Sequence, residues 1–142
     1  MSSVLKDIED LPLAEKVASG RSHVIDVLGM AWSPSPFPGI EQKLLYNDPA
    51  SGMSTVLVKM APGSQVPLHT HMGIEQAYVL EGSVVDHDGE VTAGNYAWRD
   101  SGNTHVNHAP NGALVLGFFT KPNVFFSGKD HMADYQGGDR KD

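Results

Sequence analysis

The chain contains no cysteine. This absence excludes disulfide bonds, thiolate nucleophiles, iron–sulfur clusters and every zinc site that depends on a cysteine ligand. Basic residues are also scarce, because 10 lysines and arginines face 17 aspartates and glutamates among the 142 residues, for a formal charge of −7. That balance argues against a surface that binds nucleic acid or an anionic membrane. No apolar stretch approaches the roughly 20 residues that a membrane helix needs.

Turn-forming residues are abundant instead. Fifteen glycines and nine prolines predict many short elements and argue against a helix bundle. Short runs rich in valine, leucine, tyrosine and phenylalanine alternate with turn clusters, which is the pattern of a β-sandwich or β-barrel. The runs that we expect to be strands are residues 23–32, 40–46, 54–60, 66–71, 75–80, 83–87, 95–99, 105–108 and 113–120.

The length and the 40% of hydrophobic residues predict one domain with a sizeable core. We expect residues 1–20 to be an N-terminal extension, residues 21–128 to be the all-β domain, and residues 129–142 to be a loose C-terminal tail. Acidic residues occur among the first ten positions, where a secretory leader would be apolar. The sequence therefore predicts a cytoplasmic protein.

Two histidines stand out among the seven. His69 and His71 are two residues apart, so on an extended strand both imidazoles project from the same face. Met72 and Gly73 allow a turn after them, and Glu75 can return to the same space. A further ligand must come from another strand, where His105 follows a turn that contains glycine. Imidazoles with a carboxylate are a common ligand set for iron(II), manganese, nickel, cobalt or zinc.

Residues 63–82 resemble the first motif of the cupin family. A glycine, five residues, His-x-His, three residues, a glutamate, six residues and a second glycine all occur in order. Residues 94–109 resemble the second cupin motif, but Asp100 stands where the family has proline and Ala109 where it usually has asparagine. Neither position is a metal ligand in the family. The two replacements therefore affect the expected geometry of the turn and not the expected metal site.

The resemblance, to a single-domain cupin of the RmlC-like superfamily, implies a double-stranded β-helix, or small jelly-roll barrel. It also implies one divalent transition metal, iron, manganese, nickel or zinc, bound by His69, His71, Glu75 and His105. The sequence within and between the two motifs is most similar to that of the ChrR-type cupin domain. It is also similar to cupins related to acetylacetone- and dihydroxyacetophenone-cleaving dioxygenases, which often keep three histidines and lack the glutamate.

Three functions follow from this resemblance. The first is a small metalloenzyme, a non-haem iron-type dioxygenase acting on a diketone-like or phenolic small molecule. The second is a ChrR-like regulatory domain that senses a metal or ligand, although anti-sigma factors of that type carry an additional N-terminal zinc module with cysteine ligands. The third is a structural or sugar-binding cupin whose metal is incidental. Cupins commonly pair through a sheet edge, so we expect a homodimer.

Four other side chains have expected positions. Arg99 is the nearby cation that could bind a substrate carboxylate. Trp98 is expected in the core, and Asp86 with its acidic neighbours in a solvated hairpin turn. His108 is expected outside the cavity, because it lies three residues from His105.

Overall fold

The computed structural model describes residues 20–127 and 131–134, and every regular element within these ranges is a β-strand. The strands are β1 (Ser33–Pro34), β2 (Ile40–Asp48), β3 (Met53–Met60), β4 (Ser64–His71), β5 (Glu75–Asp86), β6 (Gly89–Thr92), β7 (Tyr96–Arg99), β8 (Thr104–Ala109), β9 (Ala113–Phe119), β10 (Asn123–Ser127) and β11 (His131–Asp134). The predicted all-β class is confirmed.

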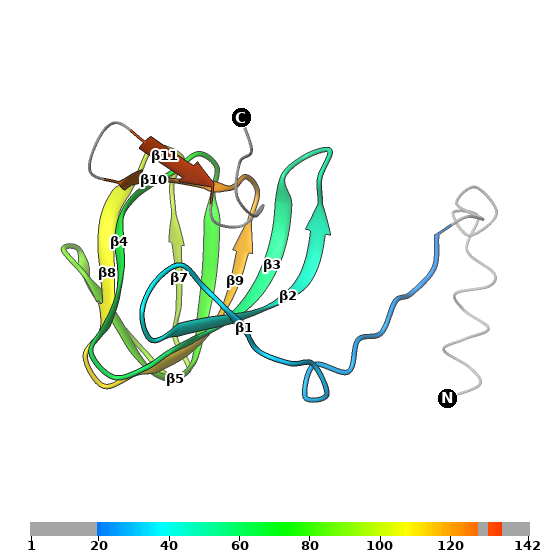
Figure 1. Ribbon diagram of the computed structural model, residues 1–142, viewed down its shortest axis with the longest axis horizontal. Helices are drawn as coiled ribbons and strands as arrows, with labels where there is room; N and C mark the ends of the chain where they lie inside the picture. Colours follow the sequence, from blue (N-terminus) through cyan, green and yellow to red (C-terminus); the bar gives the residue numbers. More distant parts are fainter. Residues whose placement is uncertain (1–19, 128–130, 135–142) are drawn as a thin grey trace.

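The strands form one antiparallel sheet that curls into a barrel (Figure 1). Its main order is β1-β2-β3-β9-β5-β8-β4-β10-β11. The long strand β5 joins the two halves, because its first part pairs with β7 and β9 and its last part pairs with β6 and β8. This is the small jelly-roll barrel that the motifs predicted.

Six of the nine predicted strands are present as separate strands, and three differ. Residues 75–80 and 83–87 were expected as separate strands but lie in the single strand β5, which continues through Gly82. Gly82 has a φ of 70°, and a Cβ there would collide with the carbonyl oxygen of Gly112, so the position requires glycine. The strand predicted for residues 23–32 is wrong. That segment leaves the barrel as an arm with a turn at Val27–Met30 (Figure 1).

The two predicted ends of the domain lie mostly outside the described residues. This holds for the extension at 1–20, except its last residue, and for the tail at 129–142, except strand β11. Within that tail, β11 pairs with β10 in antiparallel register. The division into extension, domain and tail stays a prediction.

Apolar side chains fill one region of the barrel interior. This apolar cluster consists of Ile40, Met60, Val79, Val84, Ala109 and Ala113. Alternation along β5 buries Ala77 and Val79 on the face of Glu75 and leaves Tyr78 half-exposed. Trp98 contradicts its prediction: it is 65% exposed on the outer face of β7. Over the described ranges, no helix is long and apolar enough to cross a membrane.

Candidate metal centre

Three histidines from two neighbouring strands meet inside the barrel. His69 and His71 lie on β4, and His105 lies on β8 directly opposite His69 in the strand register. Each of the three is at most 1% exposed, and their ligand nitrogens all lie within 4.8 Å of one another. Three of the four predicted ligands therefore lie together, and we call these three the histidine cluster. Their coordination of a metal stays a prediction.

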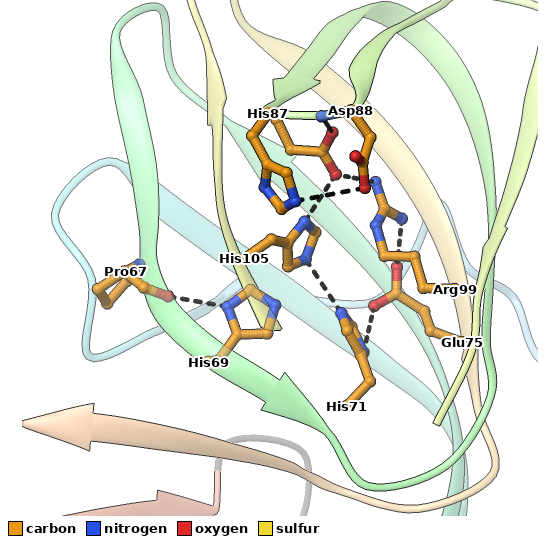
Figure 2. Close-up of polar contacts among 9 residues, drawn as sticks. Pro67, His69, His71, Glu75, His87, Asp88, Arg99 and His105 are labelled. Carbon is orange, nitrogen blue, oxygen red and sulfur yellow. Dashed lines mark hydrogen bonds and ion pairs between the residues drawn. The ribbon is translucent and has the colours of Figure 1, made fainter. Parts of the chain in front are cut away.

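Two of the three imidazoles are fixed in orientation by a hydrogen bond from Nδ1. His69 donates to the backbone oxygen of Pro67 over 2.8 Å, and His105 donates to Oδ2 of Asp86 over 2.7 Å (Figure 2). Because these acceptors carry no proton to offer, Nδ1 must be the protonated nitrogen of each ring. The Nε2 atom of each ring therefore presents its lone pair to the cluster.

The spacing of the cluster fits a bound transition metal. Nε2 of His71 lies 3.0 Å from Nε2 of His105 (Figure 2). Two imidazole nitrogens that bind one ion at right angles, each at about 2.1 Å, are about 3 Å apart. A hydrogen-bonded carboxylate on the outer nitrogen of a ligating imidazole is also the usual support of such a site, and Asp86 supplies it for His105.

The protonation of the cluster favours metal binding as well. Burial lowers the pKa of His69 to about 4. Burial also lowers the pKa of His105, although its hydrogen bond to Asp86 acts in the opposite direction. Near neutral pH these imidazoles are therefore uncharged, which is the form that binds a metal ion.

The fourth predicted ligand, Glu75, lies beside the cluster and outside the group of nitrogens that converge. Its Oε1 accepts a hydrogen bond from Nη1 of Arg99 over 3.0 Å. Its Oε2 lies 3.0 Å from Nδ1 of His71, although the angle is not that of a hydrogen bond. Burial would raise the pKa of Glu75, but His71 and Arg99 outweigh it and hold the pKa below its ordinary value. Coordination by Glu75 stays a prediction.

Arg99, the predicted candidate for binding a substrate carboxylate, lines the interior. Its side chain is 10% exposed, and Nη2 lies 3.4 Å from Oδ2 of Asp86. The expectation that Asp86 is a solvated turn residue is wrong, because its side chain is 9% exposed and contacts both Arg99 and His105. Burial opposes ionisation of Asp86, yet the His105 hydrogen bond and the Arg99 charge help keep its pKa lowered. Sequence reasoning missed Asp86.

A cavity lies beside the histidine cluster. The volume of this cavity is about 70 Å³. A volume of about 10–15 Å³ is enough to hold one water molecule. Valine, methionine, alanine and phenylalanine side chains form most of its wall, and its polar groups are His69, Glu75, Arg99, Asn107 and Asn123. Oδ1 of Asn107 is buried and accepts no hydrogen bond from the described residues, so it is free to bind a ligand. His108 does not line this cavity, as predicted.

Comparison with protein families gives one match. A family model described as the ChrR Cupin-like domain matches residues 21–124, which is well over half of the chain. A comparison with curated proteins found no significant match.

Comparison with solved structures shows the same fold in several proteins. An acetylacetone dioxygenase from Acinetobacter johnsonii is 20% identical with a TM-score of 0.70, over 82% of this chain and 87% of that one. An RmlC-like cupin protein from Ralstonia eutropha JMP134 is 18% identical with a TM-score of 0.74, over 84% and 83% of the two chains. A chain of the Rhodobacter sphaeroides complex between SigE and the anti-sigma ChrR is 23% identical with a TM-score of 0.58, over 83% and 64%.

Proposed function

The chain belongs to the family of ChrR cupin-like domains, and we propose that it is a small metalloenzyme, a non-haem iron-type dioxygenase that acts on a diketone-like or phenolic small molecule. The observation that carries this proposal is the buried histidine cluster at the wall of an internal cavity. Purely structural metal sites are usually closed, whereas three protein ligands beside a cavity leave room for a substrate.

His69, His71 and His105 would hold the metal. When bound, a divalent transition metal supplies a Lewis acid for a ligand with two oxygens, and iron(II) adds reactivity towards dioxygen. The two nearby carboxylates of Glu75 and Asp86 face the one guanidinium of Arg99. The resulting net negative charge favours a cation at this position.

The remaining residues of the cavity select the substrate. Its apolar wall excludes water and favours a compact, largely apolar molecule. The unpaired Oδ1 of Asn107 accepts a hydrogen bond from a hydroxyl group, such as that of a phenol or an enol. The restricted volume favours a substrate of a few heavy atoms over a sugar.

The same fold occurs in an acetylacetone dioxygenase and in a chain of the SigE–ChrR complex. The match to the ChrR family model favours a second candidate, a regulatory domain that senses a metal or ligand. Failure to recover any bound protein with the tagged chain, in metal-loaded and in chelated form, would count against the sensor.

Oxygen consumption tests the proposed enzyme directly. Iron-loaded protein should consume oxygen with at least one member of a panel of β-diketones and hydroxylated aromatics, measured with an oxygen electrode. His69→Ala should reduce the rate to background, because it removes one ligand. His87→Ala is the matched control, since the His87 side chain is 60% exposed and outside the cluster. An iron-loaded wild-type chain that consumes no oxygen with any member would refute the proposal.

We also propose that the protein is a homodimer. Among the described residues, β7 pairs with β5 alone, so its other edge is free to pair. Tyr96 and Trp98 on this strand are 49% and 65% exposed, and burial of such side chains would stabilise an interface. A monomeric mass by light scattering would contradict this. The cytoplasmic location stays a prediction.

A further inference from the structure

Both oxygens of the Glu75 carboxylate are engaged by side chains beside the histidine cluster. Oε1 accepts from Arg99, and Oε2 lies against Nδ1 of His71 (Figure 2). That nitrogen is on the opposite side of the imidazole ring from Nε2, the atom that faces His105. Neither oxygen of Glu75 belongs to the group of ligand atoms that lie within 4.8 Å of one another. To join that group as a ligand, the carboxylate would have to move away from its present contacts.

Arg99 is itself firmly held in the position that retains Glu75. It lies directly opposite Glu75 in the pairing of β7 with β5, and its side chain is 10% exposed. Its second terminal nitrogen contacts Asp86, which in turn accepts the Nδ1 proton of His105. Movement of Glu75 towards the cluster would leave a buried guanidinium with one of its two carboxylates, which is unfavourable in a low-dielectric interior.

We infer that Arg99 is a positioning residue that keeps Glu75 out of the metal's coordination shell, so that three imidazoles alone bind the metal. This inference rests on the proposed metal site and specifies its ligand set. Its consequence is chemical, because the position that Glu75 would have taken stays open to a ligand from the cavity. A small molecule with two adjacent oxygens could then bind without displacing a protein ligand.

Cobalt(II) is a suitable probe, because its visible absorption bands respond to the number and type of ligands. We would titrate cobalt(II) into the wild-type protein and into Glu75→Gln, Arg99→Met and the double variant, and record the spectrum and the dissociation constant of each. His87→Ala serves as the matched control for a change outside the network. Thermal unfolding followed by circular dichroism would check that each variant is folded.

Glu75→Gln alone should leave the cobalt spectrum unchanged. Arg99→Met should change the spectrum and tighten binding, because the freed carboxylate of Glu75 adds a negatively charged ligand to the metal. The double variant should recover the wild-type spectrum, because the freed carboxylate is then missing. Arg99→Lys, which keeps the charge, should retain the wild-type spectrum.

Two results would overturn the inference. One is a change in the spectrum of Glu75→Gln in the otherwise wild-type protein, which would show that Glu75 is a ligand there. This measurement decides the question even if Arg99→Met does not fold. The other is an Arg99→Met spectrum identical to that of the wild type. Absence of cobalt binding by the wild-type protein would instead refute the proposed metal site itself.

Discussion

The interior of the barrel has two parts that are equally inaccessible to water and opposite in chemistry. In the apolar cluster, Ile40 is 2% exposed and Val79 is 1% exposed. In the histidine cluster, His71 is fully buried and His105 is 1% exposed. Burial stabilises the first part through the hydrophobic effect, whereas it removes polar groups of the second part from water at a free-energy cost.

The difference in cost is visible in the protonation of the histidine cluster. Burial lowers the pKa of His69 and of His105, because it disfavours their charged forms. Hydrogen bonds and ion pairs then compensate part of this cost, through Pro67, Asp86 and Arg99. The apolar cluster therefore stabilises the fold, while the histidine cluster is suited to binding. Substitutions in the apolar cluster should therefore change the free energy of unfolding. Substitutions in the histidine cluster should change the metal affinity.

The largest expected effect on stability is in the apolar cluster. Ile40→Ala should lower the free energy of unfolding by about 2–5 kcal/mol, because it removes buried methylene groups and leaves a cavity. Urea unfolding followed by circular dichroism would measure this loss. The cobalt(II) dissociation constant of the folded variant should stay unchanged, since Ile40 does not line the cavity beside the histidines.

Leu44→Ala is the matched control for this change. Leu44 lies on the same strand, β2, but is 43% exposed, so its truncation should cost far less. Two results would contradict the separate roles of the apolar cluster and the histidine cluster. One is a similar loss of stability in both variants, and the other is a weakened metal affinity in Ile40→Ala.

The second effect is the pH dependence of the metal-free protein. The pKa of His69 is about 4 in the folded chain against an ordinary value of 6.5. As the pH falls from about 6.5 to about 4, the unfolded chain gains a proton on His69 and the folded chain does not. The free energy of unfolding should therefore decrease over this window, by at most about 3 kcal/mol from this residue. His105 should contribute in the same direction.

His69→Gln should flatten this decrease, and urea unfolding at several pH values would measure it. His87→Gln is the control, because that side chain is largely exposed and should leave the dependence unchanged. The carboxylates of Glu75 and Asp86, whose pKa values are lowered, should cost stability only at still lower pH, where they become protonated. An equally steep dependence in His69→Gln would contradict the burial cost assigned to His69.

Much of the architecture follows from the sequence alone. Turn residues mark most strand ends from residue 40 onwards, although Glu81 and Gly82 do not interrupt β5. The spacing of His69 and His71 places both imidazoles on one face. The strand predicted for segment 23–32 is wrong because apolar residues of this segment do not pack: Val24 and Leu28 are each 95% exposed on the arm. Local composition alone does not reveal whether an apolar residue has a surface to pack against.

The position of Asp86 could not be predicted, and the reason is a β-bulge. Along β5, the odd-numbered residues Glu75, Ala77 and Val79 face the interior. The pairing with β9 then shifts by one residue between Val79 and Glu81, so that Val84 and Asp86 face inward instead. Strict alternation places Asp86 outside, and nothing in the sequence marks the bulge except Gly82 beside it.

The smallest expected effect concerns this residue. Asp86→Asn should weaken metal binding by about 10- to 100-fold, the range typical of groups that orient a ligating histidine. The physical reason is that the carboxylate accepts the Nδ1 proton of His105 and holds Nε2 towards the cluster. Titration with cobalt(II) would measure the change, and the stability of the metal-free protein should change much less than in Ile40→Ala.

Asp88→Asn separates this role from a general loss of charge. Asp88 lies two residues away, but its side chain is 69% exposed and contacts only the exposed His87 among the described residues. Both substitutions remove one negative charge near the site, so a purely electrostatic effect would weaken metal binding in both variants. A loss confined to Asp86→Asn would assign the effect to the hydrogen bond with His105. Equal losses would show that the histidine cluster needs the negative field of this hairpin and no specific partner on His105.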